Sequence, residues 1–511
     1  MVRRILHLIV LALPAAAFAE IAPSSAAPAP ANAAPAPAPV IAAPANQQIP
    51  VVRVNVTNQP WDFFRPWGKR APYSRRAVGA VLPDNHVLVT AEFVANANYV
   101  EFETPEGGVK TPATIEAVDY EANLALLRTD DPKFLKPFKA LDLSIASVGD
   151  TLNVLQLETN GALLSTRGTM TNAEVSRYPV DDTSLLIYHM TASLQFREVA
   201  FTVPVVKDDK LVGLVMRYDS QQTSSDIIPT PVIEHFLKSA AEHPYKGFPR
   251  AGVAYASTRD PQLRKFAGLT DQTPGGVYVT DLQKDGPCEK AGIESGDVIL
   301  KVDGQAVDQD GNYNDPVYGR ISVSNLLSTR HYDGDDVKVV VFHKGETKDL
   351  NVHLTHRSPD QYAIEPYVID RAPKFYILGG LILEELSRQY LKEWGPEWTK
   401  KAPEDLVYLD RHQSETDPDP HHKVVFLSHL LPSDATVGYE ELHHLVITKI
   451  NNVEIHSLND VPGALEKATN GIHKVEFSGE PAAIYLDSKD IARTDGILSK
   501  VYRLPFLKRL N

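Results

Sequence analysis

The sequence contains a single cysteine, Cys288. One thiol excludes an intramolecular disulfide framework, an iron–sulfur cluster and a cysteine-rich zinc site. Positive charge is also scarce, because 51 Lys and Arg face 65 Asp and Glu and leave a formal net charge of −14. This acidity argues against non-specific binding to DNA, RNA or anionic membranes. The chain has no glycine-rich phosphate loop and no dinucleotide fingerprint, so no cofactor is expected.

Long apolar runs are missing as well. The run Ile5–Leu13 is too short to span a bilayer, and no other segment is long and apolar enough. Arg3 and Arg4 precede it, and the small residues of Ala17–Ala19 follow, which is typical of a secretory signal peptide at 1–19. The alternative is an uncleaved anchor helix. We expect an exported protein, periplasmic or extracellular, with no membrane span after removal of the leader.

A length of 511 residues corresponds to about three to four domains. Residues 20–50 consist almost wholly of Ala, Pro, Ser and Asn. Such a segment cannot bury enough apolar surface to offset its ordering entropy, which predicts an extended linker.

Between Ala77 and Tyr218 short apolar runs alternate with turn residues, which is typical of an all-β barrel or sandwich. An amphipathic helix is predicted from Pro231 to Glu242. The predicted strands include the runs 87–90, 98–102, 124–127, 152–155, 185–188 and 211–215.

Motifs in this region resemble the HtrA/Deg family of trypsin-like serine proteases. The resemblance implies a mostly β fold with a trypsin-like double β-barrel at 51–245, followed by two PDZ domains. The matching segments are Ala77–Val94 (the family's G-S-G strand and L-T-N-x-H-V), Glu121–Arg128 (T-D-x-A-L-L-K), Val148-Gly-Asp (V-G-D), Ser165–Thr169 (V-T-x-G) and the strands at Val203 and Leu211 that flank G-N-S-G-G-P-L-V in the family.

The residues that the family uses for catalysis are replaced in this chain. Glu92 stands at the position of the base histidine, Asn123 at that of the orienting aspartate, and Phe201 at about that of the nucleophilic serine. Thr202 and Val203 replace two glycines whose backbone freedom helps to form an oxyanion hole. The resemblance therefore implies a degenerate protease with no catalytic residues. An alternative is a displaced site with Thr202 as nucleophile and Glu92 as base, although carboxylates rarely activate a hydroxyl at neutral pH.

The string from Gly286 to Val307 resembles the PDZ core of HtrA proteins and places a first PDZ domain at 246–357. Asp303-Gly304 predicts a tight hairpin turn. Cys288 stands where the family has alanine, which favours a buried residue over a reactive thiol.

An internal repeat predicts a second copy of this module. Val298–Val307 aligns without gaps to Val446–Ile455. The surrounding residues resemble the enlarged second PDZ of plant-type Deg proteases, so we assign a PDZ-like domain to 358–490 and a C-terminal tail to 491–511.

A PDZ module binds a peptide by adding it as a strand to a sheet edge, while loop amides take its terminal carboxylate. The facing helix is expected from Val323 to Thr329, and the equivalent loop of the second copy is Leu378–Leu381. The alternative is that the protein's own side chains or tail fill these grooves. The candidate peptide-binding residues of the first copy are Arg250, Ala251, Gly252, Val253, Leu326 and Leu327.

The acidic stretch Asp308–Asp315 lacks the bidentate glutamate of a calcium loop, and the late histidines are read as surface residues, so no metal is expected. The resemblance implies a homotrimer or higher oligomer, for which the aromatic residues of Trp61–Trp67 are candidate anchors. The expected partners are peptides or C-termini of unfolded proteins.

Together these features predict an exported HtrA/Deg-type pseudoprotease that binds peptides or unfolded proteins through PDZ domains, as a chaperone or adaptor in protein quality control. One alternative is an active HtrA/Deg-like serine endopeptidase. Another is a regulatory subunit that assembles with an active relative.

Overall fold

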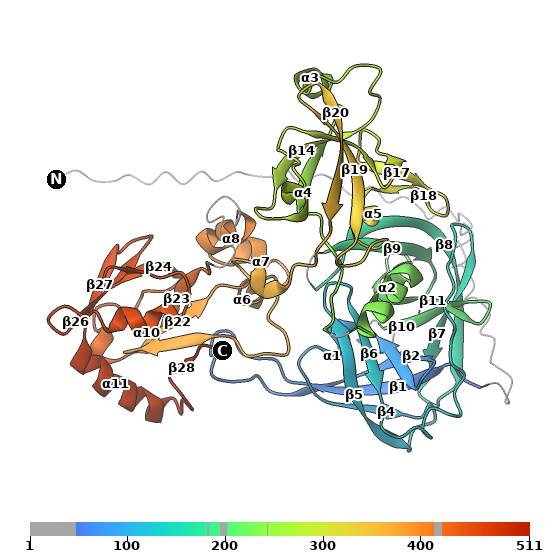
Figure 1. Ribbon diagram of the computed structural model, residues 1–511. Helices are drawn as coiled ribbons and strands as arrows, with labels where there is room; N and C mark the ends of the chain where they lie inside the picture. The colour runs from blue at the N-terminus through green and yellow to red at the C-terminus, as the bar shows by residue number, and fades with distance from the viewer. Residues whose placement is uncertain (1–47, 181–182, 195–201, 243, 413–421) are drawn as a thin grey trace, which may run out of the picture. The chain divides into compact units, whose positions relative to one another are not determined.

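The computed structural model describes residues 48–511 except 181–182, 195–201, 243 and 413–421. The predicted signal peptide and almost all of the predicted linker therefore lie outside the described residues. Over the described ranges, the chain contains no helix that is both long and apolar enough to cross a membrane. Strands dominate the described chain, which confirms the mostly β prediction (Figure 1).

The first barrel is closed by six strands in the order β1-β2-β3-β6-β5-β4. Alternate residues of a strand face opposite sides, and Val52, Val54 and Val56 of the first strand point into one apolar core with Phe102 and Leu127. The strands are β1 (Val51–Asn58), β2 (Tyr73–Leu82), β3 (His86–Val89), β4 (Ala97–Glu103), β5 (Lys110–Asp119) and β6 (Leu124–Arg128).

A second closed barrel follows, with the order β10-β11-β12-β9-β8-β7. The two barrels confirm the predicted double β-barrel. Helix α2 (Thr230–Ala240) follows this barrel, close to the predicted 231–242. The strands are β7 (Thr151–Leu157), β8 (Leu163–Arg177), β9 (Ser184–Thr191), β10 (Val203–Lys207), β11 (Lys210–Asp219) and β12 (Ser224–Pro229).

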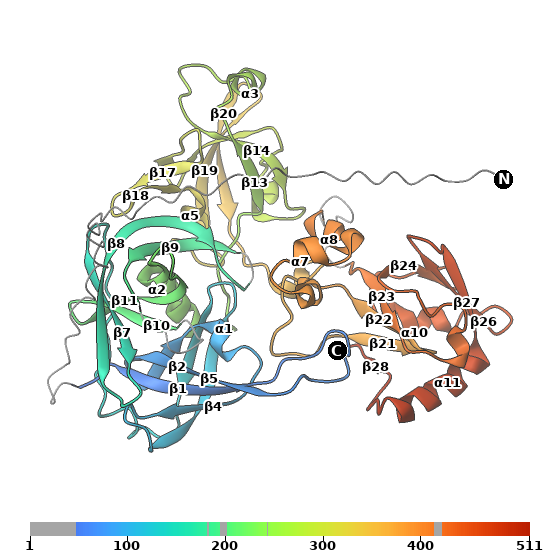
Figure 2. The same ribbon diagram turned by 180° about the vertical axis from the view of Figure 1, so that it is seen from behind.

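The next module is a sheet in the order β13-β14-β15-β19-β20, so β13 is an edge strand (Figure 2). His235 of α2 stacks between Phe248 and Tyr332 of this module, with ring centroids 4.0 and 4.2 Å away. The elements are β13 (Val253–Ser257), α3 (Pro261–Phe266), β14 (Val277–Leu282), α4 (Pro287–Lys290), β15 (Val298–Val302), β16 (Gln305–Ala306), the hairpin β17 (Asn312–Asp315) and β18 (Gly319–Ser322), α5 (Ser324–Leu327), β19 (Asp336–His343) and β20 (Glu346–His353).

The last module is built on a sheet in the order β27-β26-β24-β23-β22-β21-β28. Its strands are β21 (Phe375–Leu378), β22 (Leu381–Glu385), β23 (Val425–Leu430), β24 (Leu445–Ile450), β25 (Val453–Glu454), β26 (Ile472–Phe477), β27 (Ala483–Asp487) and β28 (Lys508–Arg509). Its helices are α6 (Arg388–Leu391), α7 (Trp398–Lys401), α8 (Glu404–Arg411), α10 (Asp460–Leu465) and α11 (Ser488–Val501), and short 3-10 turns are η1 (Pro359–Gln361), η2 (Lys392–Trp394) and η3 (Asp434–Thr436).

The internal repeat is visible as two matching hairpins. Asp303 and Gly304 both have positive φ, 48° and 75°, and join β15 to β16. Asn451 and Asn452, with φ of 51° and 63°, join β24 to β25 at the equivalent place. Asn, Asp and Gly tolerate this left-handed backbone, which two-residue hairpin turns require.

The segment 491–511 is not a separate tail. Its first part continues α11, and β28 pairs with β21 through Tyr376 opposite Lys508. The predicted boundary at 490 therefore falls inside helix α11 of the last module. The sequence pattern also did not reveal that the end of the chain supplies an edge strand of the sheet.

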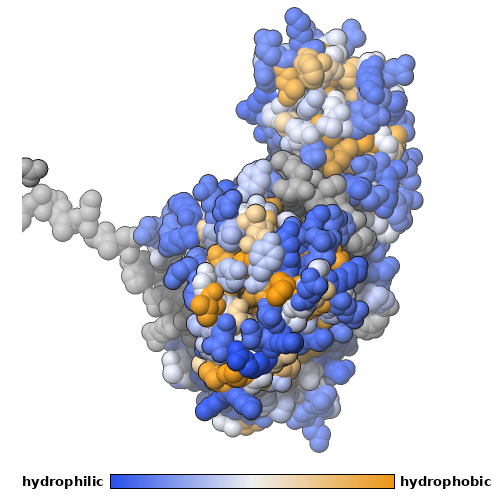
Figure 3. Space-filling view, turned by 90° about the vertical axis from the view of Figure 1, so that its left-hand side faces the viewer, coloured by the Kyte–Doolittle hydropathy of each residue, from blue (hydrophilic) through white to orange (hydrophobic). Residues whose placement is uncertain are grey.

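The aromatic segment Trp61–Trp67 contacts its own chain. Phe63 is buried in a cluster with residues of the last module. Phe64 makes edge contacts with Tyr390 and Trp394, with ring centroids 5.7 and 5.2 Å apart. Phe63 is thus packed within the chain, whereas Phe64 keeps an exposed fraction of 37%. The role of this segment as an anchor for a trimer stays a prediction. On the face in Figure 3, hydrophobic residues lie in small groups separated by hydrophilic ones.

Candidate functional site

Glu92 and Asn123, two of the positions that the resemblance assigns to the degenerate triad, are hydrogen-bonded neighbours in the structure. The short helix α1 (Ala91–Val94) carries the exposed Glu92 in its first turn. Asn123 accepts a hydrogen bond from the Glu92 backbone N–H at 2.9 Å. Thr202 accepts one from the Thr90 N–H at 3.1 Å through Oγ1. Both side chains therefore hold the start of α1, while Phe201 lies outside the described residues.

This arrangement offers little for acyl transfer. Thr202 and Asn123 both have an exposed fraction of 0%, so a substrate in solvent does not meet the Thr202 hydroxyl in this arrangement. The Asn123 amide carries no charge that could stabilise a protonated base in the way an aspartate does. Asn123 also has φ 54°, a left-handed conformation that Asn adopts more readily than most residues.

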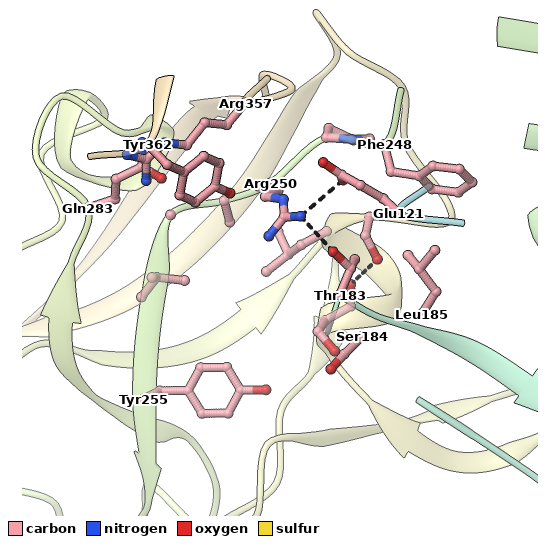
Figure 4. Close-up of a pocket in the computed structure, with 17 residues that line it drawn as sticks. Glu121, Thr183, Ser184, Leu185, Phe248, Arg250, Tyr255, Gln283, Arg357 and Tyr362 are labelled. Carbon is pink, nitrogen blue, oxygen red and sulfur yellow. Dashed lines mark hydrogen bonds and ion pairs between the residues drawn. The ribbon is translucent and has the colours of Figure 1, made fainter. Parts of the chain in front are cut away.

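A second candidate site lies at the edge strand β13. A cavity of about 450 Å³ is lined by the predicted loop Arg250–Val253, by Leu327 of α5, and by groups that precede and follow the module (Figure 4). Gly252 has φ 67°, so this turn favours glycine. The carbonyls of Ala251 and Gly252 accept hydrogen bonds from Cys288 and Gln283. In the part of the chain that the structure describes, the amide N–H groups of Ala251 and Gly252 have no acceptor.

The cavity includes most of the predicted peptide-binding residues, but not all of them. Leu326 and Leu327 are both buried in the hydrophobic core, and of the two Leu327 also lines the cavity. Helix α5 is shorter than the predicted 323–329 and spans Ser324–Leu327.

Arg250 connects this loop to the first barrel. Its guanidinium lies 3.0 Å from the buried carboxylate of Glu121 and donates to the Thr183 hydroxyl at 2.6 Å (Figure 4). Burial raises the pKa of Glu121, but Arg250 and His356 together hold that pKa below its usual range. Glu121 is thus a charged, buried partner of Arg250.

A second carboxylate lies beside this pair. Asp119 accepts hydrogen bonds from the Ala122 N–H and from the Tyr245 hydroxyl. Burial, together with the negative charge of Glu121, raises the pKa of Asp119 to about 6. His356 contacts Glu121 at 3.4 Å, and although burial lowers its pKa, Glu121 raises it above the usual value.

Several lining residues were not predicted from the sequence. Glu121 and Thr183 belong to the barrels, and Arg357 and Tyr362 follow the last strand of the module. The backbone hydrogen bond from the Arg250 N–H to the Thr355 carbonyl, 3.0 Å long, brings this following segment beside the loop. In the sequence, the position of Glu121 two residues before Asn123 was the signal that could have drawn attention to it. No local pattern in the sequence marks Arg357 or Tyr362 as residues of a site.

The equivalent loop of the last module, Leu378–Leu381, is occupied by its own chain. The Gly379 N–H donates to the Asp495 carboxylate of α11 at 2.8 Å, and the Gly379 carbonyl accepts from Ser433 at 2.8 Å. Burial raises the pKa of Asp495 to about 6. A carboxylate of the chain thus takes the place where a ligand carboxylate would bind.

Two other features concern the thiol and the metal-ligating side chains. Cys288 is buried, and desolvation raises the pKa of its thiol to about 12. Across the ranges described above, no group of three or more His, Cys, Asp and Glu is arranged to hold a metal ion.

The comparisons with known proteins agree with the two repeated modules. The PDZ domain family matches residues 252–354 and again residues 364–506. The second match extends past residue 490, as the sheet does.

Similar proteins cover most of the chain. Protease Do-like 4, mitochondrial, of Arabidopsis thaliana is 22% identical over 89% of this chain and 84% of its own length. Protease Do-like 2, chloroplastic, of the same plant is 24% identical over 85% of this chain and 70% of its own length. A solved structure described as HtrA-type protease AlgW with decapeptide has 19% identity and a TM-score of 0.46 over 61% of this chain and 97% of that chain.

Proposed function

We propose that this chain, which is homologous to the HtrA/Deg (Do-like) proteases and ends in two PDZ domains, binds peptides through its first PDZ domain and does not cut them. The observation that carries the proposal is the contrast between its two candidate sites. The Thr202 hydroxyl is buried and accepts a backbone hydrogen bond. The β13 edge has a cavity and two amide donors that no group of the described chain accepts from.

Strand addition explains how this second site would act. An incoming peptide pairs with the free side of β13, and its terminal carboxylate accepts from the Ala251 and Gly252 amides. The second PDZ domain is not expected to bind in the same way, because Asp495 already accepts from Gly379. Export to the periplasm or the exterior, and a homotrimeric or higher assembly, are further parts of the proposal. N-terminal sequencing of the mature protein and light scattering of its purified form test them.

The purified full chain is expected to leave casein intact and to resist labelling by a fluorophosphonate probe. The reason is that the Thr202 hydroxyl is buried and that Asn123, an uncharged amide, cannot serve as a base. Trypsin in parallel reactions provides the positive control for both assays. Casein digestion that is abolished by Thr202→Ala would overturn the proposal and establish a displaced active site.

The names of the relatives favour a second candidate, a working endopeptidase of protein quality control. Both Arabidopsis proteins are named as proteases. The same labelling assay separates the two candidates, since an endopeptidase of this type requires an activated nucleophile.

Substitution of Gly252 by Glu is expected to weaken peptide binding about tenfold or more. The new residue must adopt a left-handed backbone, which costs about 1–2 kcal/mol, and its carboxylate repels that of the peptide. Binding of fluorescein-labelled decapeptides that end in Val, followed by fluorescence anisotropy, measures the effect. Gly304→Glu is the matched control, because Gly304 also has positive φ but lies in an open turn with no atom near its Cβ position. Equal affinity of both variants would refute the groove.

A further inference from the structure

The two arginines that line the PDZ cavity differ in whether they have an acidic partner. Arg250 is paired with the buried Glu121 carboxylate at 3.0 Å. Arg357 also lines the cavity (Figure 4), but within the described ranges its guanidinium has no acidic partner. Its donors reach only the backbone carbonyl of Gln361, at 2.9 and 3.3 Å.

Arg357 is also held in place. Its guanidinium lies 3.8 Å from the centre of the Tyr362 ring, a cation–π contact. The Gln361 carbonyl accepts from two of its nitrogens, so a large part of its conformational freedom is already lost. A guanidinium that is oriented before a ligand arrives binds that ligand at a lower entropic cost.

This position is unfavourable for an isolated cation. Burial and the positive charge of Arg250 lower the pKa of Arg357, and among the residues that the structure describes no carboxylate offsets them. A partly buried charge without a counter-ion costs free energy that a bound anion would recover. The nearest ring, Tyr362, offsets only part of this cost.

We propose that Arg357 binds a carboxylate of the peptide and makes the first PDZ domain selective for acidic peptides. The planar guanidinium suits a carboxylate, with which it can form two parallel hydrogen bonds. The carboxylate is that of an Asp or Glu side chain near the C-terminus of the peptide, since the terminal carboxylate is assigned to the Ala251 and Gly252 amides. Arg250 is the poorer candidate, because Glu121 already accepts from it. This inference rests on the proposed peptide binding.

The overall charge of the chain opposes the binding of acidic peptides. With a formal net charge of −14, the protein repels acidic peptides at long range. Discrimination in favour of a carboxylate must therefore come from a local cation at the groove, and Arg357 is a cavity-lining cation that lacks a carboxylate partner in the described chain. Raised salt is expected to weaken this preference only modestly, because partly buried pairs are screened less than exposed ones.

A peptide series on the purified full chain tests the inference. Fluorescein-labelled decapeptides end in Val and carry one Asp at each of the six positions before the terminus, and each has a twin with Asn. A third set carries a C-terminal amide in place of the free acid. The variants are Arg357→Gln and, as a control for loss of one positive charge from the same domain, Lys338→Gln, an exposed residue of β19 outside the cavity.

We expect at least one Asp peptide to bind the unchanged protein about tenfold more tightly than its Asn twin. Arg357→Gln is expected to abolish this ratio of affinities, and Lys338→Gln is expected to keep it. If instead Arg357→Gln weakens every free acid equally, Arg357 binds the terminal carboxylate, and the inference of selectivity for acidic peptides is overturned. An Asp to Asn ratio that survives Arg357→Gln would also overturn it, with the peptide-binding proposal intact. Absence of binding by every peptide would refute both.

Discussion

Replacement of Glu121 by Ala is expected to lower the free energy of unfolding by about 2–4 kcal/mol. Removing one partner of a buried ion pair leaves the other charge desolvated and unpaired, and such losses are typically about 3–5 kcal/mol. The lower range applies here because the Arg250 side chain is 30% exposed. Loss of the Glu121 charge also relieves the repulsion that it exerts on Asp119. Urea-induced unfolding at pH 7 measures the change.

Two further variants make this prediction specific. Glu121→Leu combined with Arg250→Met removes both charges and fills a similar volume, so it is expected to recover most of the lost stability. Glu174→Ala removes an exposed partner of His189, 3.0 Å away, and is expected to cost about 0–1 kcal/mol. A cost for Glu121→Ala no greater than that of Glu174→Ala would show that the buried pair does not join the barrel to the first PDZ domain.

The parts of the fold that the sequence predicted are those with local signals. Asp303-Gly304 encodes a two-residue turn, and the turn forms where it was predicted. The apolar runs at 124–127 and 185–188 form strands β6 and β9 of the two barrels. The helix that follows the second barrel was located by its apolar spacing. Each of these signals lies within about ten residues of chain.

The candidate site depends on residues that are far apart in the sequence. Glu121 and Arg250 belong to different domains, and neither position has a pattern that announces its partner. Arg357 reaches the cavity because Arg250 and Thr355 are bonded through their backbones. Only packing of the complete chain reveals such a combination, so the sequence predicted the loop at 250–253 but not the charges around it.

Self-contacts were the other features that local reasoning missed. The aromatic residues at Trp61–Trp67 had the composition of an interface, and they form one, but with the chain's own last module. Asp495 is an ordinary acidic residue in a helical pattern, yet it accepts from the Gly379 amide. The sequence left open the alternative that the protein's own side chains fill the second groove. The contact between Asp495 and Gly379 supports this alternative.

Asp119 is expected to contribute stability at low pH that is lost as the pH rises from about 4 to 6. Burial and the charge of Glu121 raise its pKa from 3.8 to about 6. The folded chain therefore retains this proton over a range in which the unfolded chain has released it, and stability decreases with pH wherever the folded state binds more protons. The contribution is favourable at low pH and is lost as the pH passes through the folded pKa.

Asp119→Asn isolates this effect. An amide stays neutral at every pH, can still accept from the Ala122 N–H, and leaves Glu121, His356, Arg250 and Tyr245 in place. We expect the variant to be more stable than the unchanged chain by about 1–3 kcal/mol at pH 7 and no more stable at pH 4. Urea unfolding of both proteins at half-unit steps of pH provides the two curves. A constant difference between them would mean that Asp119 ionises normally, and that the buried cluster tolerates two negative charges as readily as one.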